Sequence, residues 1–274
     1  RQDQLDANPP IPLEPDWRVI YTHLRQWAKD GMSHPNPRVG YFRECWRTLV
    51  LCLYASGTRP IELIGEVEKV RKVAADGTAS VERKIRSGLR WEDVEVDMAT
   101  HVNDVSGKEF QKSVATLYIR ESKTGVPREV PCNAGDYFIR WRKFCDNYRK
   151  EQGLRPLKKS DYVFFNPYTD QPYSYTHFFR TWDEMREKLK DELSPVRSNQ
   201  KYTIYSLRSS YITNQIEEGK DIYLIKKITG HSLELLHRHY DRSDVRKRRA
   251  EATKRTYAKT QKRPTAIDLE NLEP

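Results

Sequence analysis

The stretch Tyr202–Tyr240, which reads YTIYSLRSSYITNQIEEGKDIYLIKKITGHSLELLHRHY, decides more about the fold than any other part of this sequence. Ser206, Asp221 and Ser232 belong to the types that cap helix N-termini, and each stands where a helix is expected to begin. Gly219 and Gly230 stand where helix C-caps are expected, because glycine readily adopts the left-handed backbone that ends a helix. The stretch therefore predicts three consecutive helices.

The chain before this stretch contains further helical patterns. Apolar residues at helical spacing predict a first helix capped by Asp16 and broken at 31–37. A second helix is expected over 40–56, with Gly57 as its C-cap. Aromatic and sulfur-containing residues mark two later helices: Phe138, Trp141, Cys145 and Tyr148 for one, and Phe178, Trp182, Met185 and Leu189 for the other.

Extended patterns lie between these helices. Residues 91–97 and 114–121 alternate between polar and apolar types, and residues 128–132 return after a turn at 122–127. These segments predict a small antiparallel sheet. Residues 64–88 are charged and punctuated by glycine, which indicates an insertion with its own hairpin or short helix. The predicted fold class is α+β, mainly α, with a small antiparallel β-sheet.

The composition narrows the class of protein. The 274 residues carry 49 Lys and Arg against 39 Asp and Glu, for a formal charge of +10. The many aromatic residues exclude a disordered polyelectrolyte, and no apolar run approaches the roughly 20 residues of a membrane span. The excess charge indicates a polyanion as partner. The four cysteines lack metal-site spacing and are expected to be core thiols, so no metal is predicted.

Four short motifs carry side chains suited to phosphate chemistry. They are Ser56-Gly57-Thr58-Arg59-Pro60-Ile61-Glu62-Leu63, Ser122-Lys123-Thr124-Gly125, Tyr205-Ser206-Leu207-Arg208, and Gly230-His231-Ser232 with Tyr240 nine residues after His231. Arg59 and Arg208 are suited to grip the non-bridging oxygens of one phosphodiester, because the planar guanidinium binds two oxygens and stays charged. Arg208 is expected in a helical first turn, where free N–H groups also favour anions.

The order Arg, Lys, Arg, His, Tyr resembles the catalytic domain of the tyrosine recombinases, the phage-integrase family. The 23 residues from Arg208 to His231 and the nine from His231 to Tyr240 are similar to that family as well. The resemblance spans residues 35–245 and implies a tyrosine-recombinase-like catalytic domain.

The resemblance implies a mechanism of DNA strand cleavage and rejoining. Tyr240 would attack the phosphorus and form a 3′-phosphotyrosine, and this ester conserves the bond energy, so rejoining would need neither ATP nor metal nor another cofactor. Lys123 would protonate the leaving oxygen, and His231 would donate a hydrogen bond to the phosphate. Glu62 is given a supporting role around Arg59.

One position departs from the family, which most often has His where this sequence has Tyr205. A phenol, with a pKa of about 10, is a poor general base at neutral pH. We therefore expect Tyr205 to position the phosphate or Tyr240 by a hydrogen bond and not to accept the nucleophile's proton.

Each assignment has a structural alternative. Arg59 taken alone could be a salt-bridged surface residue, Lys123 a surface turn lysine and Tyr240 a core tyrosine; the shared order and spacing favour the site. Two other functions compete with the recombinase: a type IB topoisomerase, which resembles it in the same residue types, and a DNA-binding homologue with weakened catalysis. The short Arg208–His231–Tyr240 spacing favours the recombinase.

The charge beyond the catalytic set is concentrated after Tyr240. Residues 241–263 hold ten Lys and Arg against three Asp and Glu. The densest cluster is expected to contact the DNA backbone, the alternative being a solvated helical face: Arg242, Arg246, Lys247, Arg248 and Arg249. Trp91 and Trp141 are expected in the core.

The predicted organisation has three parts. Residues 1–34 are interpreted as a linker and leading helix left from a truncated N-terminal region, since the chain begins with Arg. Residues 35–245 form the catalytic domain with its insertion at 64–88, and 246–274 form a basic segment and tail. The short amphipathic piece in 264–274 is expected to dock in trans, and the family implies a tetramer on double-stranded DNA. The expected location is cytoplasmic and nucleoid-associated, or nuclear in a eukaryotic source, with no membrane partner and no small-molecule cofactor.

Overall fold

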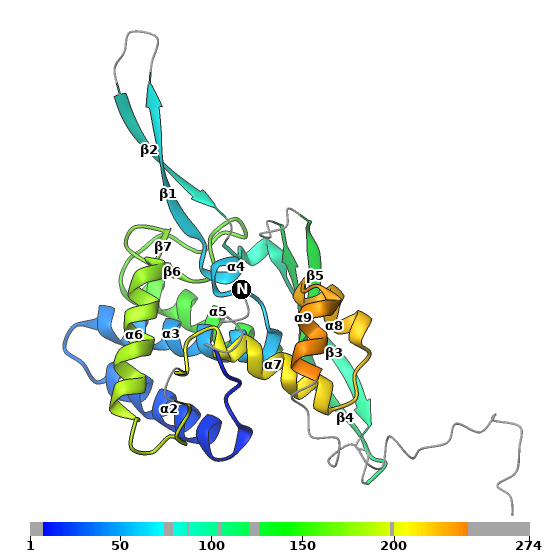
Figure 1. Ribbon diagram of the computed structural model, residues 1–274. Helices are drawn as coiled ribbons and strands as arrows, with labels where there is room; N and C mark the ends of the chain where they lie inside the picture. Colours follow the sequence, from blue (N-terminus) through cyan, green and yellow to red (C-terminus); the bar gives the residue numbers. More distant parts are fainter. Residues whose placement is uncertain are drawn as a thin grey trace, which may run out of the picture.

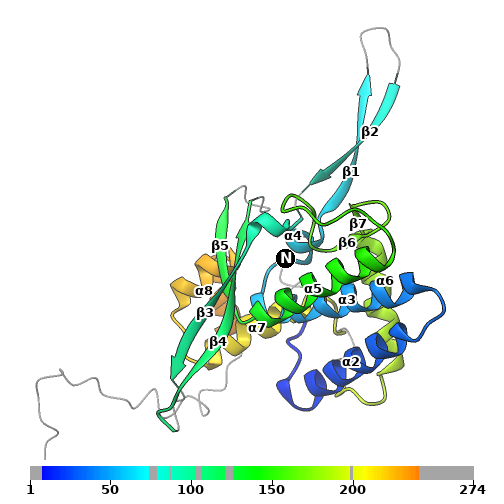
Figure 2. The same cartoon turned by 180° about the vertical axis from the view of Figure 1, so that it is seen from behind.

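Helices form most of the body, and a small sheet covers one side of it (Figures 1 and 2). The computed structural model describes residues 8–73, 79–86, 88–102, 106–120, 126–197 and 200–240. The helical elements are η1 (Leu13–Trp17), α2 (Arg18–Met32), α3 (Pro37–Ser56), α4 (Pro60–Ile64), η2 (Trp91–Asp93), α5 (Gly135–Glu151), α6 (Tyr175–Lys188), α7 (Ser206–Glu217), α8 (Ile222–Thr229) and α9 (Leu233–Tyr240). The strands are β1 (Glu66–Val73), β2 (Ala79–Arg86), β3 (Val94–Val102), β4 (Glu109–Ile119), β5 (Arg128–Cys132), β6 (Phe165–Asn166) and β7 (Gln171–Pro172). The predicted class, α+β and mainly α, is confirmed.

Helix α3 is the central helix of the body and leads directly to the first arginine motif. It begins after Asn36, whose side chain accepts the Arg38 N–H at 3.0 Å, and ends at Ser56. Gly57 is left-handed, with φ 61°, and a Cβ there would lie 2.2 Å from Cδ1 of Tyr211. Both its conformation and its close approach to α7 therefore require glycine. The predicted C-cap is confirmed, and it brings the start of the Arg59 motif against α7.

The sheet is antiparallel, as predicted, and its strand order is β3-β4-β5. Its register pairs Val96 with Ala115 and Leu117 with Val130, and the β4 residues Ala115 and Leu117 are buried. The strand expected from Trp91 begins only at Val94. Residues 91–93 form a 3₁₀ turn instead, because the Asp93 carboxylate accepts the backbone N–H of Arg90 at 3.2 Å and so satisfies it locally.

The charged insertion is a β-hairpin, one of the two forms expected for it. Strands β1 and β2 pair antiparallel, with Glu66 opposite Arg86 and Glu68 opposite Lys84. In both views the hairpin projects away from the helices and from the three-stranded sheet (Figures 1 and 2). It therefore adds a separate arm to the domain and does not extend its core.

Residues 8–16 pack onto the body, which differs from the linker expected there. Ile11 is buried, and its N–H donates to Oγ of Ser210 at 2.8 Å. Asp16 is fully buried and does not cap α2 as predicted. Its carboxylate instead accepts from the Ser194 backbone at 2.9 Å and from the Tyr202 hydroxyl at 2.6 Å. The carboxylate reaches these partners because the turn Leu13–Trp17 faces it inward, so the N-terminal helix is bonded to the C-terminal half.

The core is rich in aromatic residues from α3, α5 and α6. The residues predicted to mark α5 and α6 are all buried: Phe138, Trp141, Cys145, Tyr148, Phe178, Trp182, Met185 and Leu189. Trp91 is buried too, as expected. All four cysteines are free and buried, and burial raises the pKa of the Cys132 thiol to about 12. Among the described residues, no helix is long and apolar enough to cross a membrane.

Candidate active site

Three arginines from distant segments meet at the C-terminal end of α8. Nε of Arg128 donates to the carbonyl of Ile228 at 2.8 Å. Nη2 of Arg208 donates to the carbonyl of Thr229 at 2.6 Å, and Nη2 of Arg59 to that of Gly230 at 3.5 Å. The last carbonyls of a helix lack intrahelical partners and carry partial negative charge, so they are natural acceptors for guanidinium groups. Three consecutive carbonyls thus orient three cations just before His231.

Arg208 is the most buried of these three arginines. It lies in the first turn of α7 with only 5% of its surface exposed, and its Nη1 donates to the Gly57 carbonyl at 2.6 Å. Burial, and to a smaller extent the charge of Arg59, lower the pKa of this guanidinium to about 9, against an opposing effect of Glu62. An anion arriving beside this cation would relieve the cost of burying it. The surroundings of Arg208 are therefore suited to binding a phosphate.

His231 contacts Arg208 directly. Nη2 of Arg208 lies 2.9 Å from Nδ1 of the imidazole. The same Nη2 lies 3.4 Å from Nε2, so Nδ1 is the nearer ring nitrogen and the better placed acceptor for the guanidinium, which only donates. With Nδ1 as the acceptor, the proton of the neutral ring is on Nε2, and a neutral imidazole with this tautomer is a hydrogen-bond donor through Nε2.

A buried carboxylate holds the other two arginines. Glu62 accepts the backbone N–H of Arg59 at 2.8 Å and its Nη1 at 2.9 Å. Arg128 binds the same carboxylate with both Nη atoms, at 3.0 and 2.6 Å. Burial opposes ionisation of Glu62, but the hydrogen bonds and charge of Arg128, with smaller effects of Arg208 and Arg59, lower its pKa overall. The supporting role predicted for Glu62 agrees with this geometry.

Arg128 was not among the residues predicted from the sequence. It is the first residue of β5, and Glu62 lies 66 positions before it, so no local pattern joins them. The only available signal is its position five residues after Lys123, directly after the turn predicted at 122–127. Its partners became visible only in three dimensions.

Tyr205 stands at the start of α7, one turn before Arg208. Its hydroxyl oxygen accepts a hydrogen bond from the hydroxyl of Tyr175 at 3.0 Å. Because this bond uses a lone pair of Tyr205, the Tyr205 proton remains available for donation. The arrangement agrees with a positioning role better than with that of a base.

The remaining predicted residues lie at the end of the part of the chain that the structure describes, or outside that part. Tyr240 is the last residue of α9, which packs against α7 and α8 (Figure 1). The description covers the backbone position of Tyr240. Lys123 lies outside the described residues, as does the whole predicted DNA-binding set: Arg242, Arg246, Lys247, Arg248 and Arg249. The site that the structure brings together therefore consists of Arg59, Glu62, Arg208 and His231 with Arg128 added and Tyr205 beside them.

A groove adjoins this site between β5 and α8. It has a volume of about 720 Å³ and is lined by Arg128 and His231 together with the exposed lysines Lys226 and Lys227. The two lysines add positive charge beside the arginines, and the sequence reasoning had not singled them out. A groove with more basic than acidic residues in its lining, Glu129 being the acidic one, thus adjoins the cluster.

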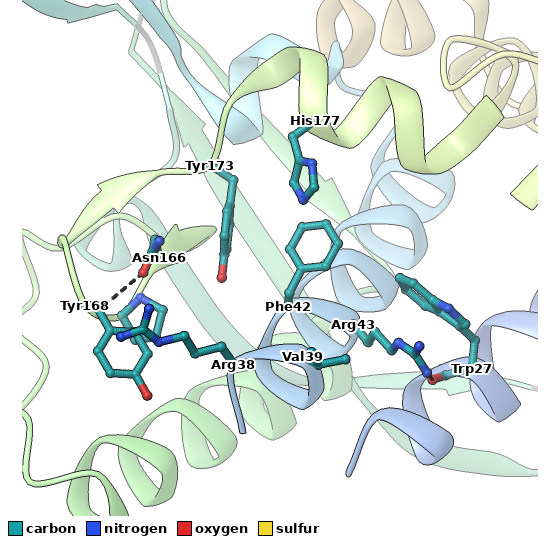
Figure 3. A pocket seen from close by; sticks show the side chains of 10 residues that line it. Trp27, Arg38, Val39, Phe42, Arg43, Asn166, Tyr168, Tyr173 and His177 are labelled. Atoms are coloured by element: carbon teal, nitrogen blue, oxygen red, sulfur yellow. Dashed lines mark hydrogen bonds between the residues drawn. The ribbon is translucent and has the colours of Figure 1, made fainter. Parts of the chain in front are cut away.

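A second hollow, of about 260 Å³, lies apart from the cluster between α2, α3 and α6 (Figure 3). Its walls are aromatic, and its two arginines are already engaged. The guanidinium of Arg38 lies 4.0 Å from the ring centroid of Tyr168, and that of Arg43 donates to the Trp27 carbonyl at 3.1 Å. No residue of the arginine cluster lines this pocket, so it belongs to the packing of the helical body.

The described part of the chain contains no cluster of side chains arranged as metal ligands. There, no group of three His, Cys, Asp or Glu residues is arranged to hold an ion. In this part, the positive charge at the cluster and in the adjoining groove comes from arginine and lysine side chains.

The fold and the cluster define a class of protein: an α+β domain in which the end of α8 gathers three arginines into a cluster suited to bind an anion. The sequence model of the phage integrase family matches residues 86–247. The chain belongs to this family and has the fold of a tyrosine recombinase catalytic domain. A search of curated protein sequences gave no significant match.

Solved recombinase structures share this fold at low sequence identity. The XerH site-specific recombinase bound to difH substrate, in a pre-cleavage complex, is 17% identical with a TM-score of 0.54 and covers 89% of this chain. The XerH post-cleavage complex with palindromic difH gives 14% identity, a TM-score of 0.52 and the same coverage. XerA recombinase gives 16%, a TM-score of 0.49 and coverage of 91% of this chain and 65% of its own. The chain spans 53% of the length of the XerH chains.

Proposed function

We propose that this chain is the catalytic part of a site-specific DNA recombinase that cleaves and rejoins strands through a covalent 3′-phosphotyrosine at Tyr240. The observation that carries the proposal is the convergence of Arg59, Arg208 and His231 at the end of α8. These residues come from three separate segments and present only cationic or neutral donors. The family membership adds support, as do the recombinase structures that share the fold.

The proposed reaction moves one phosphoryl bond at a time. The hydroxyl oxygen of Tyr240 attacks the phosphorus, the P–O5′ bond breaks, and the proton lost by tyrosine is balanced by the proton that the leaving oxygen gains, for which Lys123 is the proposed donor. Arg59 and Arg208 stabilise the charge that grows on the non-bridging oxygens, and Nε2–H of His231 donates to one of them. Rejoining is the reverse of this step, so neither ATP nor a metal ion enters the balance.

The experiment that tests this proposal uses nicked suicide duplexes with a randomised core, incubated with the protein and run on denaturing gels. The short fragment released after cleavage diffuses away, so a covalent adduct accumulates. Wild type should form an adduct, and Tyr240→Phe should form none. Tyr223→Phe is the matched control, because Tyr223 is an exposed tyrosine on α8 and should leave adduct formation unchanged. The proposal is contradicted if wild type forms no covalent adduct with any duplex. It is also contradicted if Tyr240→Phe still forms the adduct.

Relaxation of plasmid DNA separates this function from its nearest rival. A type IB topoisomerase would relax any supercoiled plasmid without a preferred site. The recombinase should instead form adducts at a restricted set of sequences in the randomised pool. Uniform adducts with efficient relaxation would favour the topoisomerase.

We further propose that four protomers act on two duplexes and that residues 264–274, which lie outside the described residues, dock on a neighbouring protomer. The acidic residues of this tail complement the positive charge of the domain. Deleting 264–274 should weaken the pairing of two duplexes, measured by gel shift, and spare cleavage by isolated protomers. Equal loss of both would contradict the docking.

A further inference from the structure

Arg128 directs all three nitrogens of its guanidinium at groups of the protein itself. Its Nε donates to the Ile228 carbonyl, and both Nη atoms donate to the Glu62 carboxylate. Its side chain is only 9% exposed. These contacts engage all three nitrogens and three of the five N–H groups, and the low exposure leaves little room for a ligand, so the geometry favours a role through its partners over a direct phosphate contact.

The partners of Arg128 are the groups that hold the other two arginines. Glu62 fixes Arg59 through its backbone N–H and through Nη1. The end of α8 fixes Arg208 through the Thr229 carbonyl, one residue after the carbonyl that Arg128 binds. The Arg128 guanidinium therefore connects Glu62, which holds Arg59, to the end of α8, which holds Arg208.

Arg128 also balances the charge of Glu62. Without it, the carboxylate, whose side chain is 1% exposed, would be paired with Arg59 alone. That pair would have no net charge, and Arg59 would offer little attraction to a phosphate. With Arg128 present, the three groups keep one positive charge, and the carboxylate is shared between two cations.

We propose that Arg128 is a positioning residue for strand cleavage: it locks Glu62 to the end of α8 and so keeps Arg59 and Arg208 in register and fully charged toward the scissile phosphate. This inference rests on the proposed function. It predicts that loss of Arg128 affects the chemical step much more than the binding of DNA, because Arg128 does not itself contact the substrate.

The test measures the rate of adduct formation at saturating DNA, and separately the affinity for DNA, on the duplex that wild type cleaves. Arg128→Gln should lower the rate about 100-fold, the size expected when reacting groups are misplaced by about 1 Å. The affinity should change less than about threefold. Arg140→Gln, at an exposed arginine on α5, is the matched control and should leave both unchanged.

A second substitution separates positioning from simple loss of structure. Glu62→Gln removes the carboxylate charge but keeps an oxygen that can accept the Arg59 N–H. Added to Arg128→Gln, it should raise the cleavage rate at least about tenfold above that of Arg128→Gln, because the unbalanced charge is gone. Arg128→Lys keeps the positive charge but cannot bind the carboxylate with two nitrogens, so it should cleave at an intermediate rate. This variant keeps the test informative if Arg128→Gln does not fold.

The outcomes that overturn the inference are distinct from failure of the proposed function. If wild type forms no adduct, the proposed function is wrong. If wild type cleaves and Arg128→Gln cleaves equally fast, or loses rate and DNA affinity in parallel, Arg128 is not a positioning residue. An additive loss in the double variant would also refute the coupling through Glu62.

Discussion

Replacing Arg208 by methionine should abolish activity and leave the stability of the fold nearly unchanged. Its guanidinium is buried and, in the described part of the chain, donates hydrogen bonds to the carbonyls of Gly57 and Thr229 and to His231, and to no carboxylate. Methionine has a similar length and no charge. Removing a buried charge with so little compensation is often neutral for stability or even favourable.

The structure allows the two opposing contributions to be compared. Burial, and then Arg59, lower the pKa of Arg208 from 12.5 to about 9, which at roughly 1.4 kcal/mol per pH unit corresponds to about 5 kcal/mol of destabilisation by the charged form. Substitution also leaves the carbonyls of Gly57 and Thr229 unpaired, at about 1–3 kcal/mol each. The two contributions nearly cancel. The free energy of unfolding should therefore stay within about 2 kcal/mol of the wild-type value.

Arg149 supplies a matched control. It is also a buried arginine, with 2% of its side chain exposed, but it is paired with Asp170 at 2.9 Å and also donates to the Arg155 carbonyl. Arg149→Met removes one of the two arginine partners of Asp170, the other being Arg155, and leaves the Arg155 carbonyl unpaired, so it should cost about 3 kcal/mol. At about 2–4 °C per kcal/mol, its melting temperature should fall by about 10 °C, and that of Arg208→Met should move by less than about 5 °C.

Two measurements decide this prediction. Thermal and urea unfolding give the stabilities, and adduct formation on the suicide duplex gives the activity. Arg208→Met should lose at least about 100- to 1000-fold in cleavage rate, the loss typical of removing one donor to a developing oxyanion. The reasoning is refuted if Arg208→Met is as unstable as Arg149→Met, or if it cleaves at a rate close to that of wild type.

Three further predictions concern other parts of the molecule. Tyr205→Phe should lower the cleavage rate about tenfold, which is the effect of losing about one hydrogen bond, and Tyr175→Phe should lower it somewhat less. The positioning role would be contradicted if Tyr205→Phe cleaved at the wild-type rate while Tyr205→His cleaved far faster. Asp16→Asn should lower the urea-unfolding free energy by about 3 kcal/mol, because Tyr202 and its neighbours lose a charged acceptor; an unchanged value would contradict the buried bonding. Bound phosphate should raise the pKa of Arg208, so the DNA affinity of the wild type should fall as the pH rises through 9. This fall should be steeper than the fall for Arg208→Met, and equal pH dependence of the two affinities would contradict the coupling.

The parts of the fold that follow local rules were predictable from the sequence. The end of α3 at Gly57 was predicted from a C-cap glycine, and Asp221 does cap α8, accepting the Leu224 N–H at 2.9 Å. Ser206 was predicted as an N-cap, but α7 includes it and its Oγ accepts the Thr203 N–H instead. Caps depend on a few neighbouring residues, so sequence patterns describe them with an error of about one residue.

The site was predictable where it follows the family's spacing and not where it depends on tertiary contacts. Arg59, Arg208 and His231 were identified from their motifs, and the structure brings them together. Arg128 was missed, because its partner Glu62 lies 66 positions away. Asp16 was predicted as a helix cap, because its actual partners lie 178 or more positions away. A buried charged residue is defined by what surrounds it, and that surrounding exists only after folding.

The way in which the arginines are held explains how the site can remain attractive to an anion. Carboxylates would orient guanidinium groups strongly but would cancel their charge. Here the described cluster uses one carboxylate for two arginines and takes its other acceptors from backbone carbonyls, chiefly the three at the end of α8. A carbonyl fixes direction through a partial charge only, so the cation stays available to the phosphate. The cost is a buried positive charge before DNA binds, seen in the lowered pKa of Arg208, and the same charge is what a phosphate entering the site would stabilise.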